Sequence, residues 1–397
     1  MSTSEITARF QLNYGDFRFD VDLILPDSGV TVLLGSSGCG KTTLLRCMAG
    51  LEHAPNGYFG INGTFWQHSE KNLFVPTHQR NLGYVFQDAN LFPHLTVKDN
   101  LLFGLKRLSN KEHFLNLFAL SVLRQAQYPL GHKDERIIST DRPELVEGRT
   151  KNNVDIITDL LGIGHLLDRM PDRLSGGEKQ RVAIARALVL NPDILLMDEP
   201  LASLDSKRKQ EVMPYLLRLQ QEFAIPIVYV THSQEEAAQL ADTLVLMKNG
   251  HVQASGKVSD TLGRIDLPLS KEKDAAVVWQ AVITRHEPEY RLTNVESKGG
   301  NLSLPMIDRP LGTKLRVQIH ARDVSITLQA PRQTSILNVL PATITGITDD
   351  QDGQIVVQLQ AGQLTLLSHV TRKSAQLLVL KPDLPVFVQI KGTSLLH

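Results

Sequence analysis

The sequence is poor in cysteine and has no excess of either charge. Cys39 and Cys47 are the only cysteines among its 397 residues, so disulfides cannot form its framework, which indicates a reducing compartment such as the cytosol. Lys plus Arg and Asp plus Glu number 42 each. Because non-specific nucleic-acid binders normally carry a basic excess, no nucleic-acid partner is expected.

Long apolar runs are also absent. No stretch reaches the roughly 18 residues that a membrane-spanning helix needs. The segment from Met1 to Arg9 is polar and lacks the apolar core of a signal peptide. The sequence therefore predicts a soluble protein whose role at any membrane would come through a partner.

Strands, loops and helices alternate over the first two thirds of the chain. Apolar runs that each end in a loop lie at 30–34, 194–197 and 227–230. Such runs indicate strands buried on both faces, hence a parallel sheet. Helical patterns lie at 43–48, 178–190 and 206–223. We predict an α/β nucleotide-binding domain over residues 1–255, with a helical subdomain at about 88–175.

The segment 110–153 inside this subdomain has little periodicity and reads as an exposed loop. A polar linker at 256–275 then leads to a different texture at 276–397, where apolar and polar residues alternate between turns. Two sets of short strands are predicted, and each ends in Val-Gln-Ile, at 317–319 and at 388–390. This favours a smaller all-β, OB-like domain built of two related units.

A phosphate-binding loop follows the first apolar run. Its G-x-x-x-x-G-K-[ST] pattern supplies backbone N–H groups for phosphate oxygens from Gly35, Ser36, Ser37, Gly38, Cys39 and Gly40. Lys41 is expected to reach the β- and γ-phosphates, and Thr42 to place its hydroxyl on Mg²⁺. Thr43 adds a further hydroxyl. Upstream, Tyr14 is a candidate to stack on adenine, and nearby Phe17 is either a second candidate or a core residue.

Two carboxylates end the apolar run 194–197. Asp198 is expected to hold Mg²⁺ through water. Glu199 stands one residue further on, where a general base for the attacking water belongs. A carboxylate at this position predicts hydrolysis, whereas a neutral residue would predict binding alone.

The order of these motifs resembles the ATP-binding cassette (ABC) ATPases, and three further pieces carry the resemblance. These are Gln87 after Tyr-Val-Phe, the signature Leu-Ser-Gly-Gly-Glu at 174–178, and His232 at the end of a strand. By resemblance, Gln87 senses Mg²⁺ and begins the helical subdomain, and His232 contacts the γ-phosphate. Relative to this family, segment 110–153 is an insertion.

The signature also implies a partner. In the family, Ser175, Gly176 and Gly177 bind the γ-phosphate of ATP held by the opposite subunit, and Asp205 belongs to the loop that crosses the dimer interface. The resemblance therefore implies a homodimer with two ATP molecules between its subunits.

A cassette without membrane helices, followed by a small β domain, is similar to an importer ATPase. Residues 333–340 resemble the opening of the Mop-type (TOBE-like) domain that ends molybdate importer ATPases. Thr334, Ser335 and Asn338 are then candidates to bind an oxyanion, or they begin a polar strand that only pairs the β units. The resemblance implies an ATPase with ATP and Mg²⁺ as cofactors, peripheral at the cytoplasmic face of the inner membrane. It also implies a permease and an extracytoplasmic molybdate-binding protein.

Three alternatives remain at this point. The same machine would serve another solute, such as sulfate, iron or a polyamine. A soluble ABC ATPase would act on nucleic acid or ribosomes, although one cassette without a basic excess does not favour it. An oxyanion sensor would use only the β domain, which the intact Lys41, Asp198, Glu199 and His232 argue against.

Overall fold

The computed structural model describes residues 5–108, 153–349, 353–392 and 394–396. It divides into two units, of which unit 1 comprises Met1–His232 and Leu246–Gln253, and unit 2 comprises Ser233–Val245 and Ala254–His397. The predicted domain boundary at residue 255 stays a prediction. The predicted insertion lies outside the described residues, except for Asn153, which is helical.

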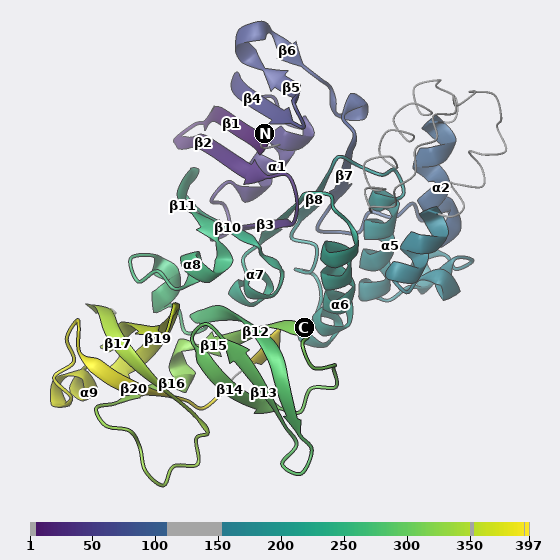
Figure 1. Cartoon of the computed structure of the whole chain (residues 1–397). Helices are drawn as coiled ribbons and strands as arrows, with labels where there is room; N and C mark the ends of the chain where they lie inside the picture. Colours follow the sequence, from purple (N-terminus) through teal and green to yellow (C-terminus); the bar gives the residue numbers. More distant parts are fainter. Residues whose placement is uncertain (1–4, 109–152, 350–352, 393, 397) are drawn as a thin grey trace, which may run out of the picture. The chain divides into compact units, whose positions relative to one another are not determined.

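Unit 1 opens with an antiparallel sheet of order β2-β1-β4-β5-β6 (Figure 1). Its strands are β1 (Glu5–Tyr14), β2 (Phe17–Pro26), β4 (Asn56–Ile61), β5 (Thr64–His68) and β6 (Leu73–Phe74). In β1 and β2 every second residue is buried, which is the period of a sheet with one face on the core. We did not predict this sheet from the sequence, although its alternation is visible there.

A second sheet carries the predicted parallel strands and has the order β11-β10-β3-β9-β8-β7. Its strands are β3 (Val30–Leu34), β7 (Leu82–Val85), β8 (Ile194–Asp198), β9 (Ile227–Thr231), β10 (Thr243–Lys248) and β11 (His251–Lys257). The pairs β3–β9, β8–β9 and β7–β8 are parallel, and β3, β8 and β9 are buried throughout. The carboxyl ends of these strands therefore meet at one edge, where ligands bind in open α/β sheets.

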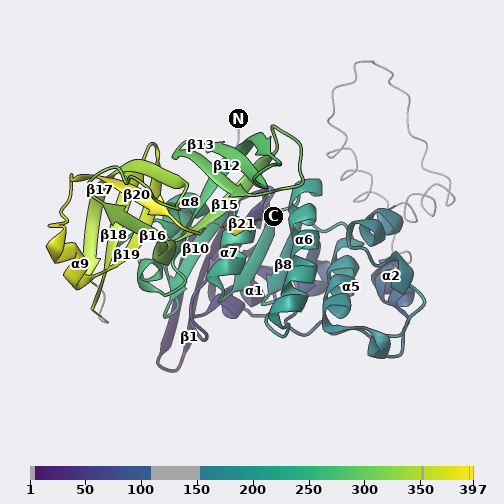
Figure 2. The same cartoon turned by 90° about the horizontal axis from the view of Figure 1, so that it is seen from below.

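Helices follow the strands as predicted. Those of unit 1 are α1 (Lys41–Ala49), α2 (Val97–Leu108), α5 (Gly176–Leu188) and α6 (Ser206–Glu222). Residues 153–160 are also helical. Helix α5 lies between α2 and α6 and contacts both (Figure 2). Of these three helices only α2 lies within the predicted subdomain at 88–175, whose bounds stay a prediction.

Arg80 closes the carboxyl end of α1, the helix that begins at the phosphate-binding loop. Its guanidinium donates to the carbonyls of Cys47 at 3.1 Å and Met48 at 2.6 Å, which lie in the last turn of α1. It also donates to Val75 O at 2.7 Å and Trp66 O at 3.3 Å. Burial lowers the pKa of Arg80 to about 10, so the side chain stays charged at neutral pH and satisfies carbonyls that α1 cannot.

Arg80→Ala is expected to lower the free energy of unfolding by about 3 kcal/mol, because several buried carbonyls lose their donor together. Denaturant titration of both proteins measures the change. Arg9→Ala is the control, since Arg9 is exposed, pairs with exposed Asp22 at 2.8 Å and lies 5.9 Å from the centroid of the Tyr58 ring, so we expect at most about 1 kcal/mol there. Equal losses in the two variants would contradict the role assigned to Arg80.

Unit 2 contains two five-stranded sheets of the same topology. The first has the order β14-β13-β12-β15-β21 and the second β16-β20-β17-β18-β19. Their strands are β12 (Ala276–Glu287), β13 (Leu292–Ser297), β14 (Gly300–Pro305), β15 (Lys314–His320), β16 (Val324–Thr327), β17 (Asn338–Asp349), β18 (Gln354–Ala361), β19 (Leu364–Thr371), β20 (Pro385–Ile390) and β21 (Ser394–Leu396). Helices α7 (Gln234–Leu240), α8 (Val258–Leu262) and α9 (Arg372–Leu377) belong to the same unit.

The two β sheets repeat each other in register. Trp279 lies opposite Val317 in the first, and Leu340 lies opposite Val388 in the second. A bulge interrupts β12 at Ile283, four residues after Trp279, and β17 at Ile344, four residues after Leu340. The prediction of two related β units is confirmed. Each Val-Gln-Ile lies on an inner strand, β15 or β20, which pairs with the long strand β12 or β17.

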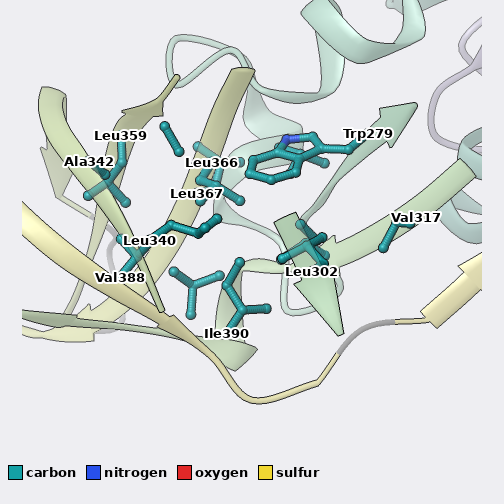
Figure 3. Packing of buried hydrophobic residues seen from close by; sticks show 14 of the residues in the cluster. Trp279, Leu302, Val317, Leu340, Ala342, Leu359, Leu366, Leu367, Val388 and Ile390 are labelled. Carbon is teal, nitrogen blue, oxygen red and sulfur yellow. The ribbon is translucent and has the colours of Figure 1, made fainter. Parts of the chain in front are cut away.

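Each β sheet is completed by a strand from the other half, which we call strand exchange. Strand β16 follows the first set along the chain but pairs with β20, and β21 follows the second set but pairs with β15. Side chains of both sheets form one apolar cluster, which includes Trp279 and Leu302 of the first sheet and Leu340, Leu366 and Val388 of the second (Figure 3). The two β units therefore share a single core.

Candidate active site

The phosphate-binding loop is shaped by two glycines. Gly40, the residue before α1, has φ of 103°, and a Cβ there would lie 2.9 Å from the ring of Phe19. A Cβ at Gly35 would clash with the carbonyl oxygen of Met247 and lie 2.8 Å from Cys39 Sγ. Only glycine fits at these two positions, so the loop can wrap tightly before α1 begins. Cys39 and Cys47 are both buried and free.

Lys41 is the buried cation of this loop. Its Nζ donates to Gly35 O at 2.8 Å and Ser36 O at 2.9 Å, and lies 3.9 Å from Cys39 Sγ. It is also 3.9 Å from Glu199 Oε1, and the side chain is only 4% exposed. The ammonium thus stands between the loop carbonyls and the carboxylate expected to act as general base.

Asp198 is held at both of its carboxylate oxygens. Thr42 Oγ1 donates to Oδ1 at 2.8 Å, and the Tyr84 hydroxyl donates to Oδ2 at 3.2 Å. Burial raises the pKa of Asp198 above its usual value, while the two hydrogen bonds partly offset this. Burial and the neighbouring Asp198 raise the pKa of Tyr84, which therefore stays a neutral donor.

Glu199 has an unusual backbone for its residue type. Its φ of 45° lies in the left-handed region, and its N–H donates to Val230 O at 3.1 Å. His232 Nδ1 lies 3.5 Å from Glu199 Oε2. The carboxylate is therefore placed between Lys41 and His232, at the edge where β8 and β9 end.

A cavity of about 560 Å³ is lined by Lys41 and Glu199 and also by the aromatic residues Tyr14 and Phe17, which we call its aromatic end. It is lined by Tyr14, Phe17, Ser37, Gly38, Gly40, Lys41, Thr42, Thr43, Arg46, Glu52, Gln87 and Glu199. The volume is in the range of small-molecule and cofactor sites. Burial raises the pKa of Tyr14 to about 12, with the carboxylate of Glu52 as the next cause. Arg46 Nε is 4.0 Å from Glu52 Oε2.

The residues present fit a magnesium–nucleotide. Among the described residues no three His, Cys, Asp or Glu side chains are grouped to hold a metal alone. Mg²⁺ rarely needs such a group, because one or two carboxylates, water and substrate phosphates usually complete its shell. The Thr42 hydroxyl and the Asp198 carboxylate supply the hard oxygen atoms that Mg²⁺ prefers.

Gly35, Ser36, Cys39, Asp198 and His232 are outside the lining of this cavity but contact Lys41, Thr42 or Glu199, which line it. Four further predicted residues also lie outside the lining: Ser175, Gly176, Gly177 and Asp205. Ser175 is exposed and caps α5, where its Oγ accepts from Glu178 N at 3.3 Å and its N–H donates to Glu178 Oε2 at 2.7 Å. Asp205 caps α6, accepting from Arg208 N at 2.9 Å. The exposed amino end of α5 presents N–H groups that suit an anion from outside the chain's own cavity.

Two of the predicted oxyanion residues, Thr334 and Ser335, lie in the loop between β16 and β17, and Asn338 is the first residue of β17. Thr334 and Ser335 are exposed, and Thr334 Oγ1 accepts from Gln389 Nε2 at 3.0 Å. Asn338 is buried, with Oδ1 accepting from Ser303 N at 2.7 Å and Nδ2 donating to Ser303 O at 3.0 Å. These bonds tie β17 to β14, as in the alternative that the residues pair the β units. The oxyanion site stays a prediction.

Sequence reasoning missed three residues at the site: Tyr84, Arg46 and Glu52. The signal for Arg46 was available, since it lies three and four residues after Thr43 and Thr42 and so shares their helix face. Glu52 follows the left-handed Gly50 and is turned back so that its N–H donates to Arg46 O. Tyr84 depends on the register of two distant strands, which no local pattern gives.

None of the helices in the described part of the chain is long and apolar enough to cross a bilayer.

Comparison with known proteins places these observations among transport ATPases. The ABC transporter family matches residues 19–202, and the TOBE domain matches residues 334–396. The molybdenum import ATP-binding protein ModC of Aromatoleum aromaticum is 46% identical, over 99% of this chain and 94% of that protein. The protein of the same name from Pseudomonas aeruginosa is 47% identical over 98% of each chain.

Among solved structures, cbiO1 of Clostridium perfringens, part of an ABC transporter complex, has a TM-score of 0.51 and 26% identity. The match covers 66% of this chain and 92% of that one. The predicted α/β cassette with a helical subdomain and an all-β second domain is thereby confirmed.

Proposed function

Because the chain belongs to the family of molybdenum import ATP-binding proteins, within the ABC transporters, we propose that it is the ATP-hydrolysing subunit of a molybdate importer. The observation that carries this proposal is the identity of 46–47% to those proteins over nearly the whole chain. The contacts of Lys41 and His232 with Glu199, and of Thr42 with Asp198, agree with it. The rival of a sensor without ATPase activity does not account for those contacts.

We propose the following roles for the residues of the cavity. Tyr14 stacks on the base at the aromatic end, and Lys41 exchanges the carbonyls of Gly35 and Ser36 for phosphate oxygens. Glu199 takes a proton from the attacking water, beside His232. Magnesium held near Thr42 and Asp198 would neutralise the phosphate charge.

The placement of Ser175 supports a two-copy arrangement. The exposed α5 end carries anion-binding groups that do not line the chain's own cavity. In a symmetric dimer, the same surface on each copy would complete the other's site. We propose that two copies enclose two ATP molecules, and that closing and opening of this pair drives a membrane permease.

The remaining partners belong to the same proposal. A permease dimer would receive the motion through the segment at Gln87 and the helical subdomain, and an extracytoplasmic binding protein would deliver molybdate. The chain would then be peripheral at the cytoplasmic face of the membrane.

Uptake in cells that lack their own molybdate ATPase subunit tests the function. The chain, expressed together with a molybdate permease, should restore molybdate accumulation from a molybdate-poor medium. Lys41→Ala should not restore it, because the phosphates lose their buried cation. Restored uptake of sulfate, iron or a polyamine without molybdate would instead support the alternative solute.

A further inference from the structure

Tyr84 contacts the nucleotide site through Asp198, and it is the tyrosine of the Tyr-Val-Phe that precedes Gln87. It lies on β7, the edge strand beside β8, three residues before Gln87. Its ring packs against that of Phe86, with centroids 4.4 Å apart. Its hydroxyl donates to Asp198 Oδ2 at 3.2 Å.

The parallel register explains how this hydroxyl reaches Asp198. Tyr84 pairs with Leu196, two residues before Asp198 on β8. At about 3.3 Å per residue the two positions are separated by roughly 6.6 Å along the strand, which a phenol side chain leaning forward can span. A shorter donor at position 84 would not reach the carboxylate.

The consequence is a carboxylate whose two oxygens are fixed by different elements. Thr42, on α1, donates to Oδ1, and Tyr84, on β7, donates to Oδ2. Asp198 is buried, so water does not hold its orientation in place of these donors. Outer partners of this kind orient metal-bound carboxylates in other proteins.

We infer that Tyr84 is a positioning residue for the magnesium–nucleotide: its hydroxyl orients Asp198 toward the cation and keeps Asp198 in register with the strand that leads to Gln87. This inference rests on the proposed function in one respect, that the cavity binds a magnesium–nucleotide. It concerns the metal-dependent part of binding, because Tyr84 does not line the cavity.

The test measures the affinity for ADP by calorimetry, with excess EDTA and with saturating Mg²⁺, in the full chain and in Tyr84→Phe. The phenylalanine ring keeps the packing and removes only the donor. We expect the gain in affinity on adding Mg²⁺ to fall about 10-fold, while ADP affinity in EDTA is unchanged. Electron paramagnetic resonance of Mn²⁺ with ADP should show the same loss of bound metal.

Tyr215→Phe is the matched control. Tyr215 lies on α6, its ring centroid is 4.6 Å from the guanidinium carbon of Arg181, and it does not line the cavity. It should leave both ADP affinities unchanged. If Tyr84→Phe melts well below the parent protein, Tyr84→Met repeats the test with an apolar chain that also lacks a donor.

Three outcomes separate the possibilities. Failure of the parent chain to bind ADP under either condition would overturn the proposed function itself. A normal magnesium gain in Tyr84→Phe, beside a parent that binds well, would overturn the role of Tyr84 alone. An equal fall with and without the metal would also overturn it, since Tyr84 would then only shape the cavity.

Discussion

Glu199→Gln is expected to lower ATP turnover by about 10²–10⁴-fold while nucleotide binding persists. The amide has the shape of the carboxylate but cannot accept the proton of the attacking water. Lys41 Nζ and His232 Nδ1 lie 3.9 and 3.5 Å from the Glu199 oxygens. The glutamine amide would remain a polar neighbour for both. Phosphate release under saturating ATP measures the loss, and filter binding of labelled ATP measures retention.

The exposed Glu222 supplies the control for this variant. It pairs with Arg218 at 3.1 Å on α6, so Glu222→Gln removes the same charge elsewhere and should leave turnover unchanged. Because the variant binds ATP without hydrolysing it, size-exclusion chromatography with ATP should show a two-copy species. Turnover near the parent rate in Glu199→Gln would assign the general base to another group.

Ser175→Asp is expected to abolish hydrolysis without unfolding α5. Aspartate caps helices as well as serine does, so the stability of the chain should be preserved. Its negative charge, however, would face the phosphate that the α5 end of one copy is proposed to bind in the other. Loss of one such donor costs about 10²–10³-fold in turnover, and repulsion adds to this.

Ser175→Ala provides the comparison, because it lacks the charge but also loses the cap. We expect it to cost about 1 kcal/mol of stability, measured by denaturant titration, with a milder loss of turnover. Burial alone would raise the pKa of Glu178, but the hydrogen bonds with Ser175 outweigh it and lower that pKa. The capping box therefore holds a charged Glu178 at neutral pH.

Mixing variants tests whether the site is shared between copies. A chain with Ser175→Asp has an intact Lys41, and a chain with Lys41→Ala has an intact Ser175. Half of the randomly mixed dimers would contain one complete site, so roughly a quarter of the parent activity should return. Unchanged hydrolysis by Ser175→Asp alone would contradict the placement of Ser175 at a partner's phosphate.

The sequence predicted those parts of the site in which the chemistry is local. The glycine loop with Lys41 follows from spacing alone, and so does the pair Asp198 and Glu199, because each set consists of neighbouring residues at the end of one predicted strand. Tyr84 reaches Asp198 across two parallel strands, and Arg80 reaches the carboxyl end of α1 from a loop far along the chain. Their partners are fixed only when the sheet order and register are known.

The β domain shows the same limit at the level of strands. The long alternating strands were found, but β16 and β21 were not, since segments of four and three residues carry too little pattern. Asn338 is a further case. Its amide was open to two interpretations, and only its bonds to Ser303 reveal what it contacts in the folded chain.

Strand exchange has a consequence for how the chain matures during translation. The first β sheet has an unpaired edge at β15 until β21 has been synthesised, and the whole second β sheet is encoded between them. At roughly 5–20 residues per second, that edge stays open for a time on the order of seconds on the ribosome. An open edge strand invites pairing with other chains, so slow or interrupted translation after β15 should expose nascent chains to aggregation.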